Sequence, residues 1–226
     1  MKRQGARDLD YRDIPVIINN RNRLSMLQQL IDWLERAEMR SIFIIDNAST
    51  YPPLLAYYGG SRHPVLRLRE NVGYLALWET AVWQEFSDDY YVYSDSDVLP
   101  DEACPYDLVK RLLELLEELP EIEKVGPGLR IDDLTKENPL KHKIQAAEAR
   151  FWRKLLRPGV YDAQIDTTFA LYRPYARGGY WARAARTAAP YVARHLPWYI
   201  DPSSRDPEEE FYREHTQAST HWTARS

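Results

Sequence analysis

The stretch Tyr90-Tyr-Val-Tyr-Ser-Asp-Ser-Asp-Val98 places two carboxylates directly after a run of aromatic and β-branched residues. Such a run is typical of a buried strand, and we predict a strand over 90–93. Asp95 and Asp97 then lie one residue apart at the end of that strand, where their charges repel each other if both ionise. A divalent cation removes this cost, and carboxylate oxygens suit magnesium or manganese. We therefore expect Asp95 and Asp97 to bind Mn²⁺ or Mg²⁺.

Strands and helices alternate on both sides of this motif. Apolar runs predict the strands, and apolar residues at helical spacing predict the helices. The strands are expected at 14–19, 42–45, 65–68 and 90–93, and the helices at 25–38, 74–86 and 108–119. Pro52 and Pro53 indicate a loop after the second strand. The alternation predicts an α/β fold with a mostly parallel central sheet flanked by helices, which binds ligands at the carboxyl ends of its strands.

The second half of the chain is less regular. Strands are expected at 125–131 and 166–172, and helices at 145–156 and 208–215. Neither a linker nor an internal repeat interrupts the pattern, so we predict one domain over 1–226.

Composition limits the classes of function. The 226 residues suit one α/β domain, and the formal net charge of -4 argues against nucleic acid as a main partner. The single cysteine, Cys104, excludes an intramolecular disulfide. Residues 1–13 lack the apolar stretch of a secretory signal, and no run approaches the roughly 18 apolar residues that span a bilayer. We expect a cytoplasmic protein without a transmembrane segment, with at most peripheral contact to a membrane.

Two further motifs suit a nucleotide. Asp46 follows the second strand in Ile-Ile-Asp-Asn-Ala-Ser-Thr, where its carboxylate can accept the imide N–H of uracil or the donors of guanine. In Asn71-Val-Gly-Tyr-Leu-Ala76, Gly73 allows a close backbone approach, and the helix expected after it would offer its N-terminus to an anion.

Together these motifs resemble the GT-A glycosyltransferases, particularly those of family 2, over about residues 14–100. The matching segments are Asn19-Asn20-Arg21-Asn22-Arg23, Asp46 to Thr50, Asn71 to Glu79, and Asp95-Ser96-Asp97. The resemblance implies a GT-A fold and a metal-dependent enzyme that moves a sugar from a nucleoside-diphosphate sugar to a hydroxyl of a glycan or another acceptor, with inversion. UDP or GDP is the expected nucleotide. Residues 14–100 would bind the nucleotide sugar, and 101–226 would form the acceptor side.

The resemblance also implies roles for individual residues. It places Asn19, Arg21, Asp46, Asn71, Gly73 and Asp95 around the nucleotide sugar, with Asp46 at the base. Asp97 would ligate the metal together with Asp95. Many members of the family take a further ligand, often histidine, from near the C-terminus, and His221 is the candidate here.

The chain departs from the family pattern where the general base should lie. Glu79 replaces the usual asparagine, and the usual Glu-Asp pair is missing. Asp166, at the edge of a predicted strand, and Glu209, at the start of a predicted helix, are the two candidates for catalysis. His195 is a candidate for lining the acceptor cleft.

Other functions remain open. The chain could be a nucleotide- or sugar-binding module without catalysis. Asp95 and Asp97 could instead serve a phosphatase of the haloacid dehalogenase type, but there the first aspartate is a nucleophile on the first strand, and here three strands precede it. A nucleotidyltransferase is disfavoured because no glycine follows the first strand.

Overall fold

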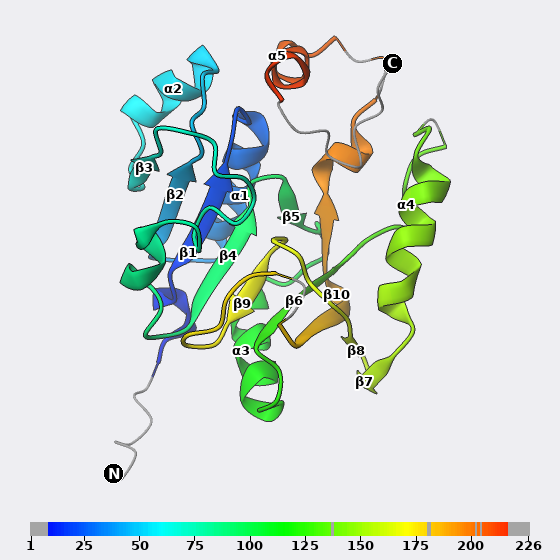
Figure 1. The fold of residues 1–226 in the computed structure, drawn as a ribbon. Coiled ribbons are helices and arrows are strands. Elements are labelled where there is room, and N and C mark those ends of the chain that lie inside the picture. The colour runs from blue at the N-terminus through cyan, green and yellow to red at the C-terminus, as the bar shows by residue number, and fades with distance from the viewer. Residues whose placement is uncertain (1–8, 137, 180–181, 202, 204, 217–226) are drawn as a thin grey trace.

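A computed structural model describes residues 9–136, 138–179, 182–201, 203 and 205–216. In that part of the chain a mixed sheet is flanked by helices (Figure 1). Its strands are β1 (Val16–Asn20), β2 (Ile42–Asp46), β3 (Val65–Arg67), β4 (Tyr91–Asp95), β5 (Val98–Pro100), β6 (Lys124–Leu129), β7 (Leu155–Arg157), β8 (Val160–Asp162), β9 (Ala170–Tyr172) and β10 (Ala184–His195). The α-helices are α1 (Ser25–Arg36), α2 (Pro52–Gly59), α3 (Leu108–Glu118), α4 (Lys141–Glu148) and α5 (Pro207–His215).

The strand order is β3-β2-β1-β4-β9-β6-β10-β8-β7, with β5 paired to β10. The first four strands of this order are parallel, so their carboxyl ends meet at one edge of the sheet. Asn19 of β1 lies in register with Asp95 of β4, and Asn20 lies in register with Asp46 of β2. The parallel part of the predicted α/β fold is confirmed, and it brings the predicted polar residues to a common edge.

The second half of the sheet adds antiparallel pairs. Strand β9 runs antiparallel to both β4 and β6, and β10 runs parallel to β6 but antiparallel to β5 and β8. The sequence analysis missed β10 because Pro190 interrupts it. The register with β6 shifts between Thr187 and Val192, and this irregularity accommodates a residue that cannot donate to the ladder.

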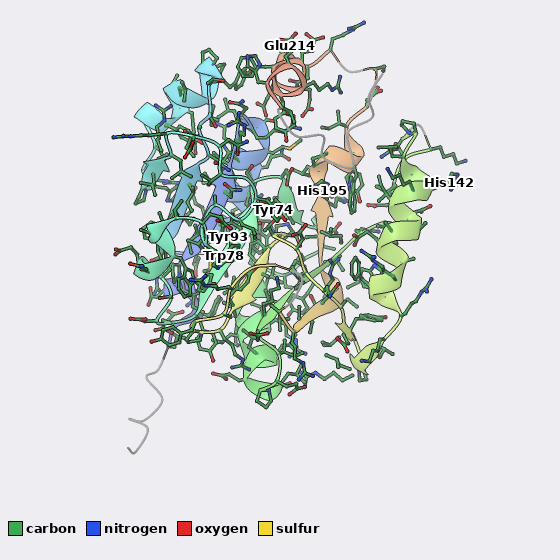
Figure 2. All side chains as sticks on the ribbon, viewed as in Figure 1. Tyr74, Trp78, Tyr93, His142, His195 and Glu214 are labelled. Atoms are coloured by element: carbon green, nitrogen blue, oxygen red, sulfur yellow. The ribbon has the colours of Figure 1, made fainter. Side chains whose placement is uncertain are left out.

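Two hydrophobic clusters cover the two faces of the sheet. Val16 and Ile18 of β1 join the cluster that contains the buried leucines of α1 and α3. Ile17 points the other way, into a cluster with Tyr91, Tyr93 and Tyr172. The ring of Trp78 packs 4.5 Å from that of Tyr93 in this second cluster (Figure 2). Strand β1 is therefore buried on both faces, as its continuous apolar run predicts.

The helix predicted over 74–86 is wrong. Residues 74–79 form turns, and only a short 3₁₀ helix, Ala81–Glu85, follows. The hydroxyl of Thr80 donates to the carbonyls of Ala76 and Leu77, and the indole N–H of Trp78 donates to the hydroxyl of Tyr91. Local side-chain bonding and tertiary packing override the apolar spacing here.

The loop predicted at Pro52 and Pro53 is also wrong, because these prolines begin α2. Proline suits the first helical positions, where no intrahelical partner exists for its missing N–H. The Asn22 side chain accepts the N–H groups of Thr50 and Tyr51 just before this helix. Other bounds differ by several residues: α4 ends at Glu148 and continues as the 3₁₀ helix Ala149–Trp152, and β9 begins only at Ala170.

Within the described residues, no helix combines the length and apolar character that crossing a membrane requires.

Candidate active site

Asp95 ends β4 at the carboxyl edge of the parallel strands. The hydroxyl of Thr167 donates to Oδ2 of Asp95 at 2.6 Å, and the backbone N–H of Asp95 donates to the carbonyl of Thr167 at 3.1 Å. Burial raises the pKa of the Asp95 carboxyl well above its usual value, and the charge of Asp97 raises it further. The two carboxylates thus repel each other in the way their spacing predicts, and a cation between them would relieve the repulsion.

Asp97 lies in the turn between β4 and β5, next to His195. Strand β10 pairs with β5 so that His195 lies opposite Val98, and its Nε2 is 3.7 Å from Oδ1 of Asp97. Figure 2 shows His195 near the end of β10. Burial lowers the pKa of His195, although the Asp97 charge opposes this, and a neutral imidazole nitrogen can ligate metals. Oδ1 of Asp97 is buried and accepts no hydrogen bond from the residues that the structure describes.

These residues fit a divalent cation that arrives with a diphosphate. Across the described ranges, no three His, Cys, Asp or Glu side chains converge as a complete protein cage. Magnesium and manganese sites on phosphate substrates commonly use one or two carboxylates, with phosphate oxygens and water at the other positions. Asp95 and Asp97 supply these carboxylates, and Oδ1 of Asp97 is a buried acceptor to which no described residue donates a hydrogen bond. His221, the predicted third ligand, lies outside the described residues.

Arg23 follows β1 and approaches the same edge from the side of α5. Its guanidinium forms an ion pair with Glu209 and lies over the ring of Tyr212, 3.6 Å from the centroid. Arg23 is 4% exposed, and burial lowers its pKa while Tyr212 and Asp97 oppose this effect. The sequence analysis quoted Arg23 in a motif but gave it no role. A buried cation within electrostatic reach of Asp97 makes it a candidate partner for a phosphate.

Glu209, predicted as the general base, lies in the first turn of α5 and is 7% exposed. Its carboxylate is taken up by the ion pair with Arg23. The adjacent Glu208 accepts the backbone N–H groups of Leu24 and Ser25 and thereby caps α1. Both carboxylates therefore join α5 to the segment that follows β1, and the role of Glu209 as a general base stays a prediction.

Asp46 lies where the sequence predicts, at the end of β2, but it is completely buried. Its carboxylate accepts hydrogen bonds from the backbone N–H of Ser49, from the hydroxyl of Tyr58 and from Nε of Arg67, the last at 3.1 Å. The Arg67 side chain is 54% exposed and forms an ion pair with this fully buried carboxylate. For Asp46 to bind a base, as the sequence predicts, the side chains that bury its carboxylate would have to move.

Asn47 holds the 71–73 turn beside Asp46. Its Nδ2 donates to the Gly73 carbonyl at 2.7 Å, and its Oδ1 accepts the Val72 N–H at 2.9 Å. The Asn71 side chain accepts the N–H of Gly73, whose φ of 83° favours glycine. The turn is thus in place near the predicted base site. The anion site expected at a following helix N-terminus is wrong, because no α-helix begins there.

Two other predicted residues differ in what they contact. Arg21 donates to the carbonyls of Asn47 and Ala48 at 2.8 and 3.1 Å, so it braces the loop after β2. Asn19 lies beside Asp95, and its hydrogen bond to that carboxyl lowers the Asp95 pKa against the stronger effect of burial.

Asp166 is brought close to Asp95 by the segment that carries Thr167. Nζ of the buried Lys124 donates to the carbonyls of Ile165, Asp166 and Gly179 at 2.7, 3.3 and 3.0 Å. Burial lowers the pKa of Lys124 to about 8. The charge of Asp166 contributes to the raised pKa of Asp95, which places the two carboxyls in one electrostatic environment. Lys124 thus fixes the backbone of the segment that contains Asp166. No sequence motif predicts this contact, because the two residues are far apart in the chain.

No known family model matches this chain, and no curated protein does. Several solved structures are similar. A glucosyl-3-phosphoglycerate synthase from Mycobacterium tuberculosis, in complex with phosphoglyceric acid, is 17% identical with a TM-score of 0.45, over 72% of this chain and 57% of that one. The synthase in complex with Mn²⁺ and UDP-glucose is 16% identical, with a TM-score of 0.39, over 72% and 56%. A structure described as a mycobacterial protein is 18% identical, with a TM-score of 0.48, over 81% and 67%.

The matched region spans little more than half of the synthase chains.

Proposed function

We propose that this protein is a metal-dependent glycosyltransferase that moves a sugar from a nucleoside-diphosphate sugar, with UDP or GDP as the nucleotide, to a hydroxyl of a glycan or another acceptor. The observation that carries the proposal is the meeting of Asp95 and Asp97 at the carboxyl edge of a parallel sheet, with His195 beside them. Open α/β sheets bind their ligands at this edge.

Each part of the donor has a candidate partner in the site. Asp97 and Asp95 would hold Mn²⁺ or Mg²⁺, which when bound bridges the diphosphate and stabilises the leaving group. Arg23, whose charge is balanced by Glu209, would donate to the diphosphate through guanidinium N–H groups that Glu209 does not use. Asp46 accepts the base N–H once Arg67 has moved aside, and the turn at Asn71 and Gly73 lines the nucleotide. Arg21 and Asn19 act indirectly, by holding the loop after β2 and the Asp95 carboxyl.

Asp166 is our candidate for the general base. In an inverting transfer the acceptor oxygen bonds to the anomeric carbon as the bond to the diphosphate oxygen breaks, and the hydroxyl proton passes to a carboxylate. Asp166 lies in the segment that also contacts Asp95, whereas Glu209 is committed to Arg23. We therefore assign the proton to Asp166 and infer inversion.

Calorimetric titration of UDP, GDP and CMP, each with and without Mn²⁺, tests the proposal. UDP or GDP is expected to bind only with the metal, and more tightly than CMP, because the cation would be held jointly by the two carboxylates and a diphosphate, which CMP lacks. UDP-glucose is the first complete donor to try. Slow hydrolysis of a bound donor supports an enzyme, while tight binding without any turnover favours a binding module. A folded sample that binds none of the three nucleotides contradicts the proposal.

A further inference from the structure

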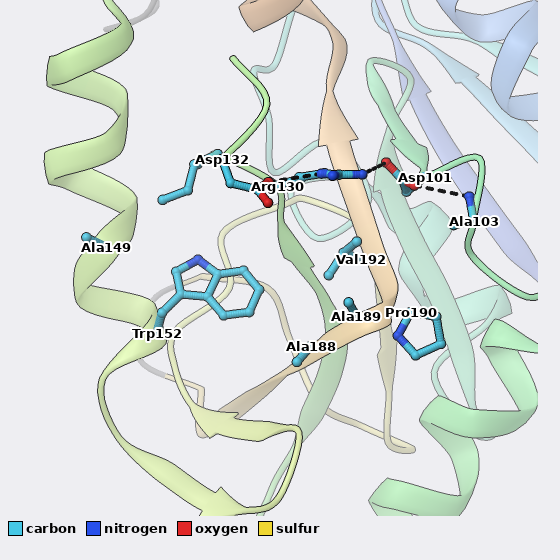
Figure 3. A pocket seen from close by; sticks show the side chains of 11 residues that line it. Asp101, Ala103, Arg130, Asp132, Ala149, Trp152, Ala188, Ala189, Pro190 and Val192 are labelled. Atoms are coloured by element: carbon cyan, nitrogen blue, oxygen red, sulfur yellow. Dashed lines mark hydrogen bonds and ion pairs between the residues drawn. The ribbon is translucent and has the colours of Figure 1, made fainter.

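A cavity of about 500 Å³ lies between β10 and the 3₁₀ helix that ends at Trp152 (Figure 3). Its apolar lining comes from Ala149, Trp152, Ala188, Ala189, Pro190 and Val192. The indole of Trp152 stands on one side, and the irregular middle of β10 stands on the other. We call this cavity the Trp152 pocket. Its volume falls within the roughly 300–1,000 Å³ of small-molecule sites.

The indole of Trp152 is fixed against the sheet. A Cβ on Gly128 of β6 would come within 2.7 Å of Cζ2 of the indole and 2.8 Å of the Thr187 carbonyl. Only glycine at this position lets the ring lie directly on the strand. The ring of Tyr161 supports it edge-on, with centroids 5.3 Å apart. The pocket thus presents a rigid aromatic surface, which lowers the entropic cost of binding a ring-shaped ligand.

The polar end of the pocket carries a net negative charge. Arg130 forms ion pairs with Asp101, Asp132 and Asp133 at 3.2, 3.0 and 3.3 Å. Arg194 pairs with Asp101 and Asp133 at 3.1 and 2.8 Å. Of these groups Arg130, Asp101 and Asp132 line the pocket, which gives one guanidinium against two carboxylates. The Asp132 side chain is 76% exposed and can accept hydrogen bonds from a hydroxyl. An anionic ligand is disfavoured at this end, and a neutral hydroxylated one is favoured.

Two short strands connect the Trp152 pocket to the carboxylates of the candidate active site. Asp101 lies four residues after Asp97, with β5 between them, and Val192 lies three residues before His195 in β10. At about 3.3 Å per residue these separations are roughly 10–13 Å. The pocket wall formed by Asp101 and Val192 therefore lies a few residues along β5 and β10 from Asp97 and His195.

We propose that the Trp152 pocket binds the acceptor, and that this acceptor is a neutral molecule with an apolar ring face and hydroxyl groups, such as a sugar or an aryl glycoside. The proposal rests on the glycosyltransferase function proposed above. It assigns the acceptor class from three features together: the fixed indole, the apolar wall of β10 and the net negative rim. A phosphorylated acceptor does not fit this rim.

The test is calorimetric titration of phenyl β-D-glucoside, a neutral aryl glycoside, and of 3-phosphoglycerate, an anionic acceptor. Ala188→Leu fills the pocket, and Ala56→Leu makes the same change at an exposed position of α2. The wild type and Ala56→Leu are expected to bind the glucoside equally, and Ala188→Leu about tenfold or more weakly. Trp152→Ala is expected to weaken binding similarly, while 3-phosphoglycerate binds to none of the proteins.

Absence of glucoside binding, equal binding by Ala188→Leu, or saturable binding of 3-phosphoglycerate that Ala188→Leu abolishes would each overturn the proposal. UDP with Mn²⁺, titrated into the same samples, keeps the two hypotheses apart. Nucleotide binding without glucoside binding overturns only the proposal that the Trp152 pocket binds the acceptor. Glucoside binding that Ala188→Leu weakens, without nucleotide binding, supports the ligand class of the pocket and overturns the glycosyltransferase.

Discussion

Replacing Asp97 with asparagine is expected to weaken manganese-dependent binding of UDP or GDP by about 100-fold or more, because a direct metal ligand contributes several kcal/mol. The substitution keeps the size of the side chain and removes its charge. Oδ1 of Asp97 is buried and accepts no hydrogen bond from the described residues, and its contact with His195 Nε2 is long at 3.7 Å, so the loss falls mainly on a ligand rather than on an internal contact. Calorimetry with and without Mn²⁺ measures the change.

The control for this variant is Asp32→Asn, which removes a carboxylate from the exposed side of α1. Its metal-dependent binding is expected to equal that of the wild type. Undiminished nucleotide binding by folded Asp97→Asn would refute the assignment of the metal site. The same titration on His195→Ala and His221→Ala identifies the histidine that contributes, since His195 lies beside Asp97 and His221 is the ligand that the family resemblance implies.

Replacing Glu209 with glutamine is expected to lower the free energy of unfolding by about 3–5 kcal/mol, the cost of leaving one partner of a buried ion pair uncompensated. The side chains of Arg23 and Glu209 are only 5% and 9% exposed, so solvent screens the pair little. Urea unfolding measures the change. Glu210→Gln, at an exposed position of the same helical turn, is expected to stay within about 0.5 kcal/mol of the wild type.

A second variant separates the structural role from a catalytic one. Arg23→Met combined with Glu209→Leu removes both charges, and it is expected to recover much of the lost stability because no unpaired charge remains buried. If Glu209 were instead the general base, Glu209→Gln would unfold at the urea concentration of the wild type and still lose turnover. That result would assign the role of general base to Glu209 of α5 and not to Asp166.

The sequence predicted the parallel half of the sheet because apolar runs and polar strand ends are local signals. Val16 to Asn20 and Tyr91 to Asp95 are each continuous buried strands followed by turn residues. Parallel pairing then fixes where Asn19, Asp46 and Asp95 meet, so the candidate edge of the sheet follows from the pattern alone.

The errors arise where distant contacts decide the structure. Apolar spacing over 74–86 suits a helix, but the Trp78 indole N–H bonds to Tyr91 and the chain turns instead. Strand β10 contains Pro190, and only its pairing with β5, β6 and β8 makes it extended. For the same reason the sequence did not predict the contact of Asp97 with His195 or that of Glu209 with Arg23. Each joins segments about 100 to 190 residues apart in the chain.

The contact between Arg23 and Glu209 joins residues that are 186 positions apart, and the cap that Glu208 gives to Ser25 spans 183. During synthesis, β1 and α1 therefore leave the ribosome long before α5 exists. At about 5–20 residues per second, the interval lasts on the order of ten seconds or more. Throughout it the guanidinium of Arg23 lacks its counter-charge, and the edge that would grip a diphosphate is incomplete. The ion pair between Arg23 and Glu209, and any ligand site that depends on it, can thus form only after α5 has been synthesised.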